Sequence, residues 1–165
     1  VAIFALQFAK MMGATAIITS SSDAKLERAK TMGADHTINY KSEAKWGDAV
    51  RKWTGGRGVD HVLEIGGPGT LPQSIQACRI GGHISLIGIL TGTAGAVPTL
   101  AMMAKQIRLI GIIVGSRRHQ QELIRALNAN TVKPVIDKTF PLSGLADAFR
   151  YEEGAQHFGK ICVEI

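Results

Sequence analysis

The sequence predicts an α/β fold built around a doubly wound parallel sheet, and three observations support this prediction. Short apolar segments with the length of buried strands alternate with longer segments of helical periodicity. The strand segments are almost continuously apolar, as they are when helices cover both faces of a parallel sheet. The chain has 19 glycines, which lie singly or in pairs at the ends of the apolar runs, where turns are expected. The apolar content of 45% excludes an intrinsically disordered chain.

The expected elements follow from local patterns. Residues 1–12 are apolar on almost every face, which predicts a helix buried on most sides, with Gly13 at its end. Trp46, Ala49, Val50 and Trp53 have the spacing of an amphipathic helix. Strands are expected at residues 15–19, 37–39, 59–65, 84–90 and 107–114. Further helices are expected from Asp23 to Gly33 and near residues 99–105. Another is expected from Pro72 to the glycines at 81 and 82, with Cys78 on its inner face. The last is expected around residues 123–127 and should end near Asn128 or Asn130.

The pattern changes at Lys133. Residues 135–140 and 161–165 alternate between apolar and polar side chains, as half-exposed strands do, and they flank one helix around Ala148. We therefore expect two parts, with the sheet domain over residues 1–132 and a C-terminal segment over residues 133–165.

One element of a doubly wound, Rossmann-type sheet is missing from this pattern. Each helix of such a fold is preceded by a strand, yet the chain starts at Val1 inside its first helix. The first strand and the glycine-rich turn that binds a dinucleotide are therefore expected to be absent. Their place would lie between the strands at 15–19 and 59–65. Either upstream residues fill it in the intact protein, or the two strands close up and distort the site.

The charge balance is basic but dispersed. Nineteen basic and thirteen acidic side chains give a net charge of +6 and a pI near 9.6. The densest cluster is only Arg117–His119, and the aromatic content of 5% argues against a nucleic-acid stacking platform. A basic surface that attracts a phosphorylated small molecule is therefore favoured over a nucleic-acid partner. Gln7, Lys10 and Gly13 interrupt the apolar N-terminal run, which argues against a membrane segment.

Two cysteines, Cys78 and Cys162, lie far apart and lack the spacing of metal ligands. We interpret them as buried free thiols of a reducing compartment, which favours the cytoplasm. The chain is expected to encode no zinc site.

The turn after the 15–19 strand carries the first candidate site. In a Rossmann-type domain an acid at this position binds the adenosine ribose of NAD, whereas its absence beside cations accommodates the 2′-phosphate of NADP. Here Ser20, Ser21 and Ser22 occupy the turn, and Lys25 follows one helical turn later. The alternative is that Ser22 caps the helix and Lys25 is merely solvated.

Three longer segments resemble one family. Residues 33–40 (GADHTINY), 55–67 (GGRGVDHVLEIGG) and 81–88 (GGHISLIG) resemble the cofactor domain of the medium-chain dehydrogenase/reductase superfamily. That superfamily includes zinc-type alcohol dehydrogenases and zinc-free quinone oxidoreductases. The likeness runs through the whole chain and is greatest for the quinone oxidoreductase-like and NADPH-dependent branches.

The resemblance implies roles for particular residues. Ser21, Ser22, Lys25 and Tyr40 would surround the 2′-phosphate. Gly66 and Gly67 would allow close approach of the cofactor, although a simple strand-to-helix turn explains them equally well. Ile87 and Gly88 would lie beside the nicotinamide, Gly115 and Ser116 would form the next such turn, and Lys160 would approach the cofactor or remain solvated. Arg117 and Arg118 are more simply surface charges.

No residue fits the role of catalytic acid, base or nucleophile. The five histidines are dispersed, and Glu64, inside an apolar strand, is most simply bonded to nearby backbone. The resemblance implies that substrate contacts and any zinc ligands come from a GroES-like catalytic domain absent from this chain, on which residues 133–165 would pack. The expected function is NADP(H)-dependent hydride transfer to or from a carbonyl, quinone or activated alkene. NAD is the less favoured cofactor, and the fragment alone is expected to be inactive.

The same resemblance predicts a homodimer, because the 107–114 strand would form an apolar outer edge that pairs across a two-fold axis. Two other classes remain as alternatives. One is a non-catalytic nucleotide-binding or interaction protein with this fold. The other is a methyltransferase, although that class prefers an acid where this chain has serines.

Overall fold

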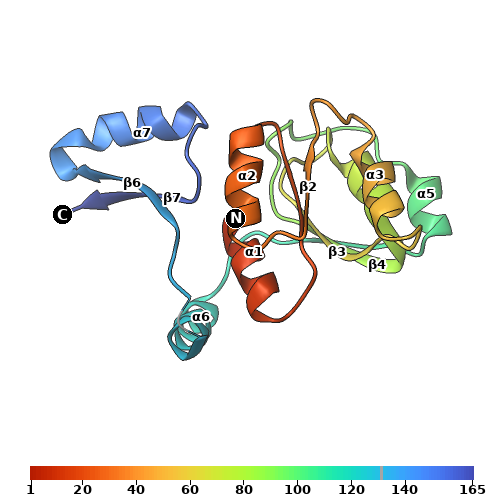
Figure 1. Ribbon diagram of the computed structural model, residues 1–165, viewed down its shortest axis with the longest axis horizontal. Helices are drawn as coiled ribbons and strands as arrows, with labels where there is room; N and C mark the ends of the chain where they lie inside the picture. The colour runs from red at the N-terminus through yellow and green to blue at the C-terminus, as the bar shows by residue number, and fades with distance from the viewer. Residues whose placement is uncertain (131) are drawn as a thin grey trace.

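The computed structural model describes residues 1–130 and 132–165, whose strands pair in three parallel groups (Figure 1). β1 (Ile17–Ser20) pairs with β2 (His36–Asn39). β3 (Val59–Glu64), β4 (Cys78–Leu86) and β5 (Arg108–Gly111) form a sheet in that order. β6 (Ile136–Pro141) pairs with β7 (Lys160–Glu164). All these pairs are parallel, so each needs a crossover.

Helices supply the crossovers. The helices are α1 (Ala2–Met11), α2 (Asp23–Thr31), α3 (Trp46–Trp53), α4 (Leu71–Ala77), α5 (Thr99–Ala104), α6 (Arg117–Asn130) and α7 (Leu145–Glu153), with a 3₁₀ turn at Leu142–Gly144. α2 connects β1 to β2, and α7 connects β6 to β7. This alternation confirms the predicted α/β class.

Helices pack on both faces of β1. Ile18 contacts a cluster that contains Leu6 of α1 and Ala29 of α2. Its neighbour Ile17 points the other way and packs against a cluster that contains Val50 of α3. Successive residues of a strand face opposite sides, so the sheet is covered on both faces, as the doubly wound prediction requires.

β1 and β3 do not pair. Within the described residues β1 bonds to β2 and β3 bonds to β4, and the two strands belong to separate sheets. The alternative in which these two strands close up on each other is therefore not met. α1 is also less enclosed than predicted, because Leu6 is its one fully buried residue.

The boundary between α4 and β4 differs from the sequence prediction. Cys78 was expected on the helix, but it begins β4 with an extended backbone, φ −70° and ψ 144°. The Lys105 ammonium donates to the main-chain carbonyls of Ile75, Gln76 and Cys78, at 2.9, 2.7 and 3.1 Å. This distant cation satisfies the carbonyls at the end of α4, so the helix stops before the glycines at 81 and 82.

Two predicted strands end at least three residues early at their carboxyl ends. β4 ends at Leu86 rather than residue 90, and β5 ends at Gly111 rather than residue 114. The Ile112 amide still donates to the Leu86 carbonyl at 2.8 Å. Beyond that point the 87–92 segment bonds to the turn after β3, so β5 has no strand left to pair with.

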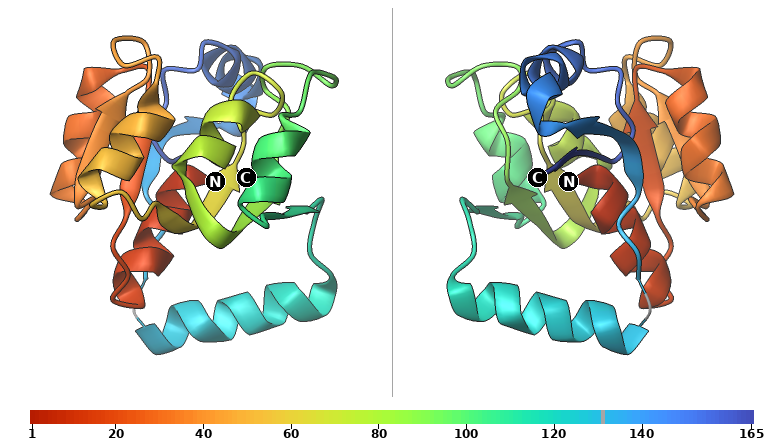
Figure 2. Two further views of the ribbon diagram at one scale, coloured as in Figure 1. Left: turned by 90° about the vertical axis from the view of Figure 1, so that its right-hand side faces the viewer. Right: turned by 90° about the vertical axis from the view of Figure 1, so that its left-hand side faces the viewer.

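The C-terminal part forms the predicted β-α-β unit, β6-α7-β7, beside α2 (Figure 1). α6 lies apart from the strands (Figure 2), and none of its residues is buried. None of the described helices combines the length and apolarity needed to cross a membrane.

Candidate functional site

The turn after β1 is built by its serines. The Ser22 hydroxyl accepts from the Lys25 amide at 3.4 Å and caps the N-terminus of α2, while the Ser20 hydroxyl accepts from the Ser22 amide at 3.2 Å. Capping by a serine holds the remaining amides of the first turn pointing toward the end of the strand. The capping expected of Ser22 is therefore confirmed.

A surface cavity of about 300 Å³ opens at this turn. The residues that line it are Ser21, Ser22, Ala24, Lys25, Arg28, Ala155 and Gln156. Three of the four residues expected at a 2′-phosphate are thus brought together. Tyr40 does not line the cavity. Its amide donates to the Ser20 carbonyl at 3.1 Å, which places the Tyr40 backbone beside the turn.

The cavity is cationic. The Lys25 ammonium donates to the Ala155 carbonyl at 2.6 Å, a neutral partner that leaves the positive charge uncompensated. Arg28 is paired with Asp137 at 3.0 Å, and its guanidinium carbon lies 4.1 Å from the centre of the Phe158 ring. None of the lining residues is acidic. A phosphate group matches this combination of hydroxyls, helix N-terminus and lysine.

The turns after β3 and β4 pack against each other. The Thr91 amide donates to the Gly66 carbonyl at 2.8 Å. Gly67 has φ +85°, and a Cβ there would lie 2.9 Å from Cα of Ile89. A Cβ on Gly88 would overlap the Ile65 carbonyl. The glycines are therefore required for two backbones to meet at the carboxyl edge of the sheet, where doubly wound folds bind ligands.

Comparison with known proteins identifies the family. The family model described as "Zinc-binding dehydrogenase" matches residues 1–129. The chain belongs to the zinc-binding dehydrogenase family. This confirms the resemblance to the medium-chain dehydrogenases and reductases.

Three proteins illustrate the relationship. A zinc-type alcohol dehydrogenase-like protein of Schizosaccharomyces pombe is 42% identical over all of this chain and 49% of its own length. A 2-haloacrylate reductase of Burkholderia is 32% identical over 93% of this chain and 49% of its own length. The crystal structure of an alcohol dehydrogenase described as putative, from Sinorhizobium meliloti, has a TM-score of 0.91 and 40% identity over 99% of this chain and 47% of its own. The chain spans about half the length of the relatives it matches.

The other predicted site residues of this zinc-binding dehydrogenase chain lie elsewhere. The Ser116 hydroxyl accepts from the His119 amide at 3.3 Å and caps α6, so Gly115 and Ser116 lie directly before that helix. The Lys160 ammonium lies 5.7 Å from the centre of the Phe4 ring, at the N-terminal end of α1. Neither group lines the cavity at Ser21 and Lys25.

Sequence reasoning missed four cavity residues, which are Ala24, Arg28, Ala155 and Gln156. Arg28 follows Lys25 by three positions on α2, so helical spacing was a signal that could have identified it. Ala155 and Gln156 lie about 130 positions away in the chain, and no local pattern connects them to the serine turn.

A zinc site does not fit the described residues of this chain. In residues 1–130 and 132–165, no three His, Cys, Asp or Glu side chains gather where they could hold a metal ion. Two of the histidines make contacts of another kind. His61 Nε2 and Ser85 Oγ are 2.8 Å apart, and burial, followed by the nearby His83, lowers the pKa of His61. His36 stacks on Trp53 with the ring centres 5.1 Å apart.

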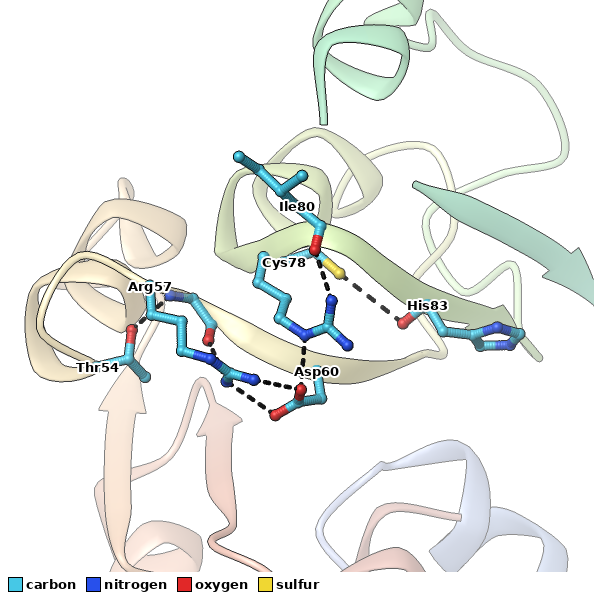
Figure 3. A network of polar contacts seen from close by, with 8 residues as sticks. Thr54, Arg57, Asp60, Cys78, Ile80 and His83 are labelled. Atoms are coloured by element: carbon cyan, nitrogen blue, oxygen red, sulfur yellow. Dashed lines mark hydrogen bonds and ion pairs between the residues drawn. The ribbon is translucent and has the colours of Figure 1, made fainter. Parts of the chain in front are cut away.

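A second cavity, of about 280 Å³, lies at the amino-terminal ends of β3 and β4. Figure 3 shows the polar contacts beside it, among them those that join Arg57 to Asp60. Arg51, Arg57 and Arg79 are among its lining residues. Asp60 accepts from Arg57 at 2.5 Å and from Arg79 at 2.6 Å, and these bonds hold the pKa of its carboxyl far below the usual range. Asp60 compensates only part of the charge of Arg57 and Arg79, and Arg51 donates to the neutral Gly56 carbonyl at 2.7 Å, so this cavity is cationic as well. It lies at the edge of the sheet opposite to the one where doubly wound folds bind ligands, which favours the cavity at Lys25 for a nucleotide.

Proposed function

We propose that this chain is the nucleotide-binding half of an NADP(H)-dependent oxidoreductase. The enzyme would transfer a hydride between the nicotinamide and a carbonyl, a quinone or an activated alkene. The observation that carries the proposal is the cationic cavity at the carboxyl end of β1, which has serine hydroxyls and Lys25 in its wall and no acidic residue.

The chain's own residues would hold and orient the cofactor. Ser21, Ser22 and Lys25 would bind the 2′-phosphate, with Tyr40 beside it. The turns at 66–67 and 87–88, which contact each other at the carboxyl edge of the sheet, would support the nicotinamide half. Lys160 of β7, whose ammonium lies near Phe4 in the first turn of α1, would approach the pyrophosphate. The bound cofactor supplies the hydride, and the protein positions it and excludes water.

The name of the 32% identical relative, 2-haloacrylate reductase, supports an activated alkene as one substrate class. A structure described as an NAD-dependent alcohol dehydrogenase, 34% identical to this chain, keeps NAD as the alternative cofactor. The serines at the end of β1, where an acid would bind the ribose of NAD, favour NADP. A methyltransferase is disfavoured both by the family and by the uniformly parallel strand pairs.

We also propose a homodimer formed through the β5 edge, because Ile110, Ile113 and Val114 are 50%, 91% and 81% exposed there. The free thiols of Cys78 and Cys162 agree with a cytoplasmic location.

Fluorescence titration of the natural protein with NADPH, NADH and S-adenosylmethionine tests the proposal. We expect NADPH to bind most tightly and to be oxidised by a quinone or an activated alkene. Tighter binding of NADH would contradict the cofactor assignment. NADPH binding without turnover of any carbonyl, quinone or alkene would favour a non-catalytic nucleotide-binding protein, and binding of S-adenosylmethionine alone would favour a methyltransferase.

A further inference from the structure

The Glu64 carboxylate lies at the last position of β3 and is only 3% exposed. Its Oε1 accepts from the amides of Gly66 and Gly67 at 2.7 and 3.0 Å, and from the Thr70 hydroxyl at 2.6 Å. Its Oε2 accepts from the Ser74 hydroxyl on α4. One buried side chain therefore binds the whole turn between β3 and α4 and joins it to that helix.

The main chain of the same residue holds the second turn. The Glu64 carbonyl accepts from the amides of Ile87 and Gly88 at 2.8 and 3.2 Å. The two donors follow directly after the end of β4, so these bonds hold the 87–92 segment against the turn after β3. Glu64 thus bonds to both turns at the carboxyl edge of the sheet. Its side chain holds the turn after β3, and its main-chain carbonyl holds the turn after β4.

The contacts also restrict what Glu64 can do. Both carboxylate oxygens are occupied by fixed donors, and the group is shielded from solvent, so it has no path to a reacting atom. The amides of Gly66 and Gly67 are used by this carboxylate and cannot donate to a cofactor phosphate. The turn can offer a ligand only close approach of its bare backbone, in the conformation that Glu64 imposes.

We propose that Glu64 is a positioning residue for the cofactor, which acts by fixing the 66–67 turn against the 87–88 turn. This inference rests on the proposed function, because it assumes that a nicotinamide cofactor lies at this edge. Without the Glu64 contacts, the glycine backbone at 66–67 could move by small distances. Small displacements of this kind are enough to misplace a bound cofactor. The effect should therefore be on cofactor binding and not on general stability alone.

The variants Glu64→Gln, Glu64→Met and Ser74→Ala separate these possibilities in the natural protein. In Glu64→Gln the amide oxygen can still accept every donor of the turn, and its NH₂ group can donate to Ser74, so we expect the dissociation constant for NADPH to stay within about threefold. Glu64→Met fills the same space without an acceptor and should weaken NADPH binding by at least about tenfold. Ser74→Ala removes only the contact to α4. It should lower the melting temperature and leave NADPH binding within about twofold.

Thr70→Val gives the same contrast if Glu64→Met does not fold. Thr70→Val removes one donor to Oε1 and should lower the melting temperature about as much as Ser74→Ala does. Unlike Ser74→Ala, it should raise the dissociation constant for NADPH by about threefold or more. NADPH binding equal to wild type in both Glu64→Met and Thr70→Val would overturn the inference, as would equal weakening by Ser74→Ala and Thr70→Val. Failure of the wild-type protein to bind any nicotinamide cofactor would instead contradict the proposed function, and the inference with it.

Discussion

The ammonium of Lys25 donates a 2.6 Å hydrogen bond to the main-chain carbonyl of Ala155, about 130 positions later in the chain. This contact joins α2 to the loop between α7 and β7 and closes one side of the cavity at the serine turn. It also orders the lysine side chain before any ligand binds, which reduces the entropy lost on binding.

We first predict that Lys25→Ala weakens NADPH binding selectively. A charge-assisted bond to a phosphate contributes roughly 1.5–3 kcal/mol, so the dissociation constant should rise by about tenfold or more. NADH lacks the 2′-phosphate, and its binding should hardly change. Fluorescence titration with both cofactors measures this, and Lys30→Ala, a lysine on the same helix paired with Glu27, serves as the control. Equal weakening of both cofactors would show that Lys25 does not contact the 2′-phosphate.

The second prediction concerns acid stability. Asp137 is 10% exposed, and its pKa is lowered chiefly by the hydrogen bond from Tyr151 and further by Arg28. A carboxyl whose pKa is lower in the folded state stabilises the folded protein fully when the pH is above its pKa in the unfolded chain, about 3.9. This stabilisation is lost as the pH falls through the pKa of the folded state. The melting temperature of Asp137→Asn should therefore lie below that of wild type at pH 7, with the gap narrowing as the pH falls below about 4. A gap that is the same at pH 7 and at the acid limit would contradict this account.

The third prediction concerns Gly67, where φ is +85° and a Cβ would lie 2.9 Å from the Ile89 backbone. Gly67→Ala should reduce the free energy of unfolding by at least about 1–2 kcal/mol, because the left-handed conformation is strained for alanine. Gly111→Ala is the matched control, since nothing lies within 4 Å of its Cβ position. Urea denaturation should show a loss for the first variant and little change, or a gain of about 0.4–1 kcal/mol, for the second. Similar stability of both variants would contradict the close packing of the two turns.

The fourth prediction tests the proposed dimer. Light scattering at micromolar concentration should give the mass of two copies of the natural protein. Ile113→Asp places a charge on a side chain that is 91% exposed beside the β5 edge, and it should shift the protein toward monomer. Met12→Asp, at a position that is 78% exposed at the end of α1, should leave the mass unchanged. A monomeric wild-type protein would contradict the proposal.

Local sequence patterns were sufficient for the order and type of the elements. The Trp46–Trp53 spacing, the serine cap at Ser22 and the alternation of strands with helices each depend on residues close together in the chain, and the structure confirms them. The same local logic identified the turn at Ser21 and Ser22 and the glycines at 66 and 67, because turn chemistry follows from a few neighbouring residues.

Contacts between distant segments were needed for the remainder. α4 ends at Ala77 because Lys105, nearly thirty positions later, binds its last carbonyls, and no pattern around Cys78 reveals that cation. β5 stops at Gly111 because the 87–92 segment is bonded to Glu64 and Gly66 and cannot extend β4. Ala155 and Gln156 enter the cavity at Lys25 because the β6-α7-β7 unit lies beside α2. The end of a strand depends on which backbone amides and carbonyls still lack a hydrogen-bond partner, and the wall of a cavity depends on which segments lie beside it. Both are decided only when distant parts of the chain pack together.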